Sequence, residues 1–221
     1  MKLPQTLFVA ASFFVSFHDS QAANVVIFNV AGGADIDTLW ANADGSLMTT
    51  GKVSVGYFGP SVTVDQIDTI AELFSKLGEF TTLTSATPGS SSTFLAPGYV
   101  AEDPFQFAPS SLIGRTLYAI ATNAASLNAA TLSSGYSMFT FGSVVADDLG
   151  ENDYVANPAG VTPIIGVLGT FTGDPGGAAT DAFGPAASGN YTTLKLVAVP
   201  EPSTTLLGAV GALALLRRRR N

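Results

Sequence analysis

Short runs of β-branched and aromatic residues, separated by turn-forming residues, dominate the hydrophobic pattern of this chain. The first run, Val25 to Val30, has the composition of a buried strand. Clusters of Gly, Pro, Ser, Asn and Asp lie between the runs, and these residues favour turns. From Thr193 onward, polar and apolar residues alternate, as in a strand with one face open to water. The pattern predicts a mainly β protein with strands over residues 25–30, 53–58, 116–122, 136–141, 164–171 and 191–199.

One segment instead shows helical spacing. Thr63 and Gln66 match a capping box, and apolar residues follow at helical intervals. These apolar positions are Ile67, Ile70, Ala71, Phe74 and Leu77. Gly78 suits the C-terminal cap. We therefore expect a single β-sandwich-like domain, residues 23–198, with one packed α-helix at about residues 64–77. Residues 84–97 and 173–189, rich in Ser, Thr, Pro and Gly, are predicted to be long exposed loops.

The N-terminus has the layout of a signal peptide over residues 1–22. Lys2 supplies a basic start, and an apolar stretch of suitable length covers residues 7–17. Small residues at Ser20 and Ala22 predict cleavage by signal peptidase between Ala22 and Ala23. The alternative is an uncleaved N-terminal anchor. Either outcome implies export of residues 23–198 across the inner membrane.

The C-terminal segment, residues 199–221, has three parts in a fixed order. Pro200 and Pro202 flank Glu201 and favour an extended backbone that a peptidase could bind. Residues 206–216 are apolar, but a full membrane span needs about 20 such residues. The four arginines Arg217, Arg218, Arg219 and Arg220 mark the cytoplasmic end of a short membrane helix. An ordinary tail anchor or a disordered basic tail is the alternative.

This layout resembles the PEP-CTERM sorting signal of Gram-negative bacteria. The resemblance covers about the last tenth of the chain, and the Leu-Arg-Arg-Arg-Arg ending is similar to the variant common in Verrucomicrobia and Planctomycetes. It implies that an integral-membrane transpeptidase, exosortase, recognises Pro200, Glu201 and Pro202 and cuts at or next to them. It further implies a transient C-terminal anchor in the inner membrane and then release to the cell surface or the extracellular space.

The composition between the two termini excludes several kinds of active site. The chain contains no cysteine, and its one histidine is His18, within the predicted signal peptide. The mature protein therefore lacks the residues of a Ser-His-Asp triad, a Cys-His pair or a usual zinc site. We expect no enzymatic activity, no cofactor and no metal.

Charge excludes nucleic acid as a partner. The chain has 17 Asp and Glu residues against 9 Lys and Arg, for a net charge of −8. Lys2 and the four terminal arginines lie in the targeting segments, which leaves only Lys52, Lys76, Arg115 and Lys195 between them. A surface of this kind repels a phosphate backbone.

Two acidic clusters leave other functions open. One combines Asp35, Asp37 and Asp44 with Asn42; the other comprises Asp147, Asp148, Glu151 and Asp153. Neither cluster has the ligand spacing of a calcium loop, so solvated turns are the favoured interpretation. Paired carboxylates can also catalyse glycoside hydrolysis, which keeps a hydrolase as a third hypothesis.

Aromatic residues suggest polysaccharide as an alternative partner. Trp40, Tyr57 and Phe58 could stack on a sugar, although core positions are the more common role for such residues. The favoured function is a structural or adhesive protein of the cell surface or extracellular matrix. A carbohydrate-binding module is the alternative.

Overall fold

The structure is a computed structural model that describes residues 23–29, 38–89, 96–100, 105–107, 112–144, 153–173 and 189–198. The predicted signal peptide (residues 1–22) and C-terminal membrane helix (within residues 199–221) lie outside the described residues. So does most of the predicted loop at 173–189.

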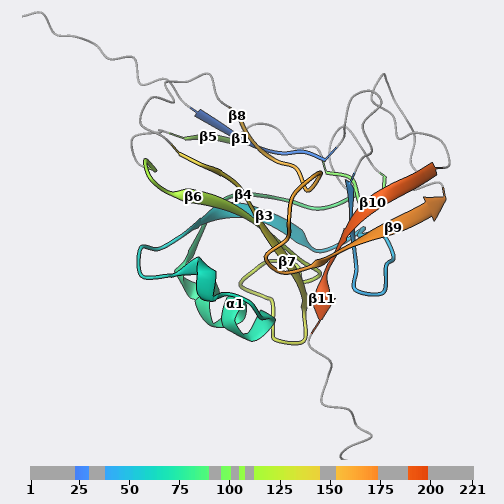
Figure 1. Ribbon diagram of the computed structural model, residues 1–221, viewed down its shortest axis with the longest axis horizontal. Coiled ribbons are helices and arrows are strands. Elements are labelled where there is room, and N and C mark those ends of the chain that lie inside the picture. The colour runs from blue at the N-terminus through green and yellow to red at the C-terminus, as the bar shows by residue number, and fades with distance from the viewer. Residues whose placement is uncertain are drawn as a thin grey trace, which may run out of the picture.

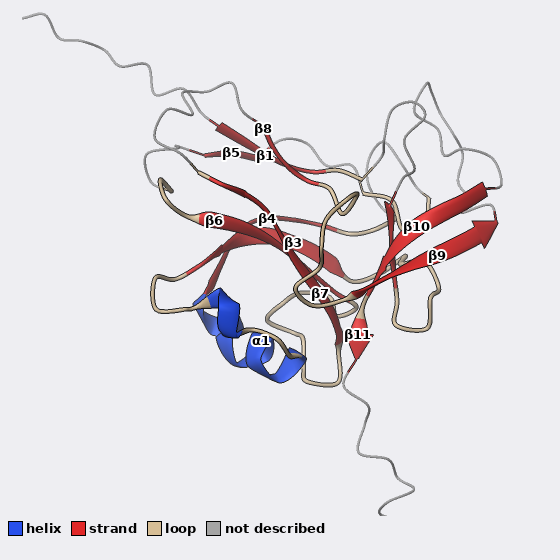
Figure 2. Ribbon diagram, viewed as in Figure 1, coloured by secondary structure: helices blue, strands red, loops and turns tan. Residues whose placement is uncertain are grey.

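The described residues are mainly β, as predicted, with one short α-helix (Figures 1 and 2). The strands are β1 (Ala23–Ile27), β2 (Thr38–Ala41), β3 (Lys52–Phe58), β4 (Phe80–Ala86), β5 (Phe105–Phe107), β6 (Thr116–Thr122), β7 (Gly135–Ser143), β8 (Asp153–Ala156), β9 (Val167–Gly173), β10 (Gly189–Lys195) and β11 (Val197–Ala198). The helix α1 (Ile70–Lys76) lies between two 3₁₀ turns, η1 (Val64–Gln66) and η2 (Leu77–Glu79).

The described strands form three sheets and not the two of the predicted sandwich. The largest has the order β11-β7-β6-β3-β4, with every neighbouring pair antiparallel. The two smaller sheets have the orders β5-β1-β8 and β2-β10-β9. Each small sheet contains one parallel pair, β1 with β8 and β2 with β10. Hairpins cannot make a parallel pair, so segments distant in sequence must meet.

Apolar side chains fill both faces of the five-stranded sheet. On one face the main core joins it to the two small sheets, through residues such as Val25, Val55 and Leu194. On the other face a second cluster joins Ile120 and Met138 to the helix region. Figure 1 shows the β5-β1-β8 sheet and α1 on opposite sides of the large sheet. The predicted packing of the helix against a sheet is confirmed.

The helix begins later than its sequence pattern predicts. The capping box forms at Thr69 and Glu72, where the Glu72 amide donates to Thr69 Oγ1 at 3.2 Å and the Thr69 amide donates to Glu72 Oε2 at 2.9 Å. The Thr69 hydroxyl also donates to this carboxylate, which lowers the pKa of Glu72 below its ordinary value. Thr63 makes no such bond, so η1 precedes the helix instead of extending it. Of the predicted apolar face, Ile67 and Ile70 are buried and Phe74 and Leu77 pack against the same cluster, whereas Ala71 is exposed and Leu73 is buried in addition.

Strand boundaries also differ from the predictions, most clearly at β4 and β9. Thr84 to Ala86, predicted as part of a loop, end β4, which pairs antiparallel with β3. β9 starts at Val167 and not at Ile164, because Ile164 and Ile165 pack into the cluster beneath the helix. Backbone bonds between these two residues and Met138 hold them there.

The buried side chain of Asn29, two residues after β1, forms hydrogen bonds with two other segments of the chain. Its Nδ2 donates to the carbonyls of Thr38 at 2.9 Å and Gly98 at 2.8 Å. Its Oδ1 accepts from the Val100 amide at 2.7 Å. A buried amide with three such bonds fixes the relative positions of the strands it joins.

Candidate functional site

The predicted sorting segment follows directly after an edge strand of the large sheet. β11 is the outermost strand there, with Val197 opposite Tyr136 and Ala198 opposite Gly135 on β7. The preceding Leu196 is buried, and its amide donates to the Ala41 carbonyl at 2.9 Å. The folded domain therefore holds the chain up to Ala198. The predicted motif Pro200–Glu201–Pro202 and the cluster Arg217–Arg220 lie outside the described residues, as does the predicted cleavage position Ala22. Ala23, the predicted mature start, is buried in β1.

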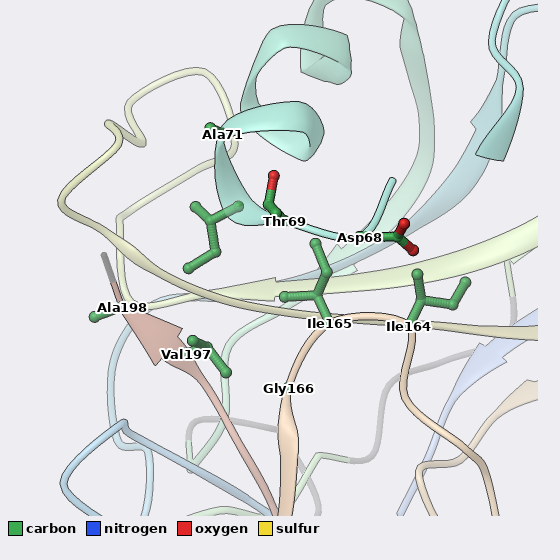
Figure 3. A pocket seen from close by; sticks show the side chains of 9 residues that line it. Asp68, Thr69, Ala71, Ile164, Ile165, Gly166, Val197 and Ala198 are labelled. Carbon is green, nitrogen blue, oxygen red and sulfur yellow. The ribbon is translucent and has the colours of Figure 1, made fainter. Parts of the chain in front are cut away.

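A groove of about 440 Å³ borders β11 (Figure 3). Three segments distant in sequence line it: the start of the helix (Asp68 to Ala71), the turn before β9 (Ile164 to Gly166), and β11 itself. Among the described residues, its walls are mostly apolar, and Asp68 is the one carboxylate on them. The sequence did not predict this groove, because its three segments are distant in sequence and meet only in the folded domain.

Asp44, the one acidic residue of the two predicted clusters whose side chain the structure describes, stabilises a turn. Asp44 Oδ1 accepts from the Ser46 amide at 2.9 Å and from the Ser46 hydroxyl at 2.7 Å. These bonds lower the pKa of Asp44 below its ordinary value. Among the described residues, no group of acidic side chains could hold a metal ion. Asp35, Asp37, Asp147, Asp148 and Glu151 lie outside the described part of the chain, and for Asp153 only the backbone, in β8, is described.

We expect calcium to bind at most weakly. The Asp44 carboxylate already accepts two hydrogen bonds from Ser46, and the acidic spacing does not match a calcium loop. Calorimetry with Ca²⁺ should show no submicromolar affinity. An affinity in that range, abolished by Asp44→Asn or Asp147→Asn, would instead assign a calcium site to these loops.

Two of the three aromatic candidates for sugar stacking are core residues. Trp40 is 0% exposed and stacks on Phe139, with ring centroids 5.8 Å apart. Phe58 is buried between Phe80 and Tyr118. Tyr57 is half-buried, and the Arg115 guanidinium lies 5.5 Å from its ring centroid. The described surface therefore does not present these three rings as a common platform.

Comparison with known protein families identifies a motif at the C-terminus. A family model described as the PEP-CTERM protein-sorting motif matches residues 198–220. This chain carries a PEP-CTERM sorting domain. The match begins at Ala198, the last residue of β11, one position before the predicted boundary. No curated protein and no solved structure matches the PEP-CTERM protein.

The motif makes the PEP-CTERM protein a substrate for sorting by exosortase, which implies export. The sequence analysis predicted a PEP-CTERM sorting signal from Pro200–Glu201–Pro202 and the terminal arginines, and this prediction is confirmed. Within the part of the chain that the structure describes, no helix is long and apolar enough to cross a membrane.

Proposed function

We propose that this PEP-CTERM protein is a structural or adhesive component of the cell surface or extracellular matrix and not an enzyme. The observation that carries the proposal is the sorting motif at residues 198–220, joined without an intervening linker to the last strand of a folded β domain. A cargo domain placed next to a processing signal is a passive substrate of exosortase. In this proposal the folded domain acts after sorting, through contacts that its surface makes outside the cell.

The composition of the domain supports a non-catalytic role. With no cysteine and with its one histidine in the predicted signal peptide, the mature protein lacks the thiol and imidazole groups that a Cys-His pair or a Ser-His-Asp triad requires. The acidic balance favours solubility outside the cell. Polysaccharide binding remains the alternative, but the burial of Trp40 and Phe58 removes its main structural support.

In this proposal the chain is processed at both ends. Signal peptidase removes residues 1–22, and the segment beyond Pro202 holds the domain transiently in the inner membrane. Exosortase then cuts at or near Pro200–Glu201–Pro202 and passes the domain to the cell surface or the extracellular space.

Mass analysis of the surface protein tests the proposal at both termini. We expect an N-terminus at Ala23, because small residues at Ser20 and Ala22 suit signal peptidase. We expect a C-terminus that lacks Arg217–Arg220. A surface protein that retains the four arginines would show that the tail is a plain membrane anchor.

A further inference from the structure

The groove beside β11 lies close to any enzyme that binds the sorting motif. Ala198 is the last residue of β11 and also part of the groove wall. Pro200, the first residue of Pro200–Glu201–Pro202, is two positions further along the chain. Two residues span about 7 Å at most, even when fully extended. An enzyme that holds the motif in a cleft must therefore come next to the groove.

The contacts of β11 keep the motif at this short distance from the folded domain. Val197 and Ala198 pair with β7, opposite Tyr136 and Gly135. The preceding Leu196 is 2% exposed, and its amide donates to the Ala41 carbonyl at 2.9 Å. The fold thus holds the backbone to within two residues of Pro200. The enzyme meets the motif and this end of the domain together.

The predicted membrane anchor limits the approach from the other side. The apolar stretch that starts at Leu206 is four positions beyond Pro202. Four residues span about 14 Å at most, so the motif of the anchored chain stays near the membrane surface. An enzyme embedded in the same membrane binds the motif between the bilayer and the domain. The end of the domain that carries β11 and the groove then faces this enzyme.

The walls of the groove have the chemistry of a protein contact. Figure 3 shows Ile164 and Ile165 beneath the start of the helix, with Val197 and Ala198 beside them. Asp68 is exposed on the same lining, and no described basic residue forms an ion pair with it. An apolar surface with a charged group beside it is the usual composition of an interface between proteins.

We propose that this groove is a docking site for exosortase, which contacts the folded domain here while it holds Pro200–Glu201–Pro202. The inference rests on the processing proposed above. The short motif alone offers few contacts, and the groove adds apolar area next to it. Binding energy from a contact remote from the reacting bond raises the rate of cleavage at low substrate concentration. A basic side chain of the enzyme would pair with Asp68 at this site.

A substitution on the groove wall tests the docking. Ala71 lines the groove and is exposed, and glutamine forms helices nearly as well as alanine, so Ala71→Gln should keep the fold. We expect it to slow the C-terminal cut roughly tenfold, because a longer polar side chain interferes with an apolar contact. Pulse–chase labelling of the full-length chain, in a host that carries the cognate exosortase, measures the rate at which the tail is lost.

Two controls isolate the contact from changes in stability. Ala43→Gln makes the same change at an exposed alanine in the turn after β2, outside the groove lining, and should be cut at the normal rate. About eight Gly and Ser residues inserted between Ala198 and Val199 let the motif bind away from the groove. The inserted chain should be cut at the slow rate, and Ala71→Gln should have no further effect in it.

Each other outcome refutes the docking site. If the unmodified chain is cut and Ala71→Gln is cut equally fast, exosortase does not use the groove, although the proposed processing stands. Failure to cut the unmodified chain would refute both proposals. Equal slowing by Ala71→Gln with and without the insertion would assign its effect to the fold. Faster cutting of Ala71→Gln would show that the groove holds the chain's own tail. Self-association that Ala71→Gln abolishes in sedimentation would assign the groove to a second copy.

Discussion

Replacing Glu201 and Pro202 together by alanine is expected to leave the PEP-CTERM protein in the inner membrane instead of at the cell surface. Exosortase would no longer recognise the segment that follows β11, and the short apolar stretch would stay attached to the domain. The fold should not change, because the last described backbone pairing is between Ala198 and Gly135, before the motif. We expect a nearly complete shift from the surface fraction to the membrane fraction.

Fractionation of a host that carries the cognate exosortase, with mass analysis of the C-terminus, measures this shift. Thr205→Ala is the matched control, since it alters the same tail outside the motif and should be sorted normally. Surface protein of normal mass from the double variant would show that the motif does not direct processing.

The four arginines should have a different and separable effect. Arginine resists transfer across the membrane, so we expect Arg217–Arg220 to keep the C-terminus on the cytoplasmic side. When all four are replaced by neutral residues, the chain is expected to pass through the membrane and leave the cell uncut. The released protein would then have the mass of the signal-cleaved chain with its whole tail.

Trp40→Ala is expected to destabilise the domain by about 3–5 kcal/mol. The side chain is 0% exposed, and its ring stacks on Phe139 at an interplanar angle of 27°. Removal of the indole leaves a cavity in the main core, where β2 meets the large sheet. Since domains of this size are stable by about 5–15 kcal/mol, this change uses much of the total. Denaturant unfolding of the exported protein measures the loss.

Trp40→Phe separates the packing of the ring from the unpaired Nε1 donor, and Leu132→Ala is a control at the surface. Trp40→Phe keeps an aromatic ring and removes the buried Nε1 donor, which has no hydrogen-bond partner among the described residues. It should cost only about 1 kcal/mol, because part of the lost packing is offset by removal of that unpaired donor. Leu132→Ala, at a position that is 45% exposed, should change stability by less than about 0.5 kcal/mol.

The same variants test the polysaccharide alternative. A buried Trp40 cannot stack on a sugar in the folded domain, so Trp40→Phe should leave any glycan affinity unchanged. A pull-down in which Trp40→Phe abolishes glycan binding, with stability largely kept, would contradict the core role assigned to this residue.

Local chemistry made the central strands and the sorting signal predictable. The cores of β1, β3, β6 and β7 are rich in β-branched and aromatic residues, and each was found within a few residues of its predicted position. β4 has β-branched threonines but only two large apolar side chains, so it lacks the hydrophobic run that marks the central strands, and its pairing with β3 defines it as a strand. The helix start was misplaced because Thr63–Gln66 and Thr69–Glu72 both have the spacing of a capping box, and only Thr69 forms it.

The sequence by itself determined that the protein carries a sorting motif and that its fold is mainly β. The sorting motif could be identified without a structure because a processing enzyme reads it as a linear segment, in the order of its residues. The tertiary structure decided the division of the described strands into three sheets and the burial of Trp40. These features depend on contacts between distant segments, such as the parallel pairing of β2 with β10, and no local pattern specifies which strands become neighbours.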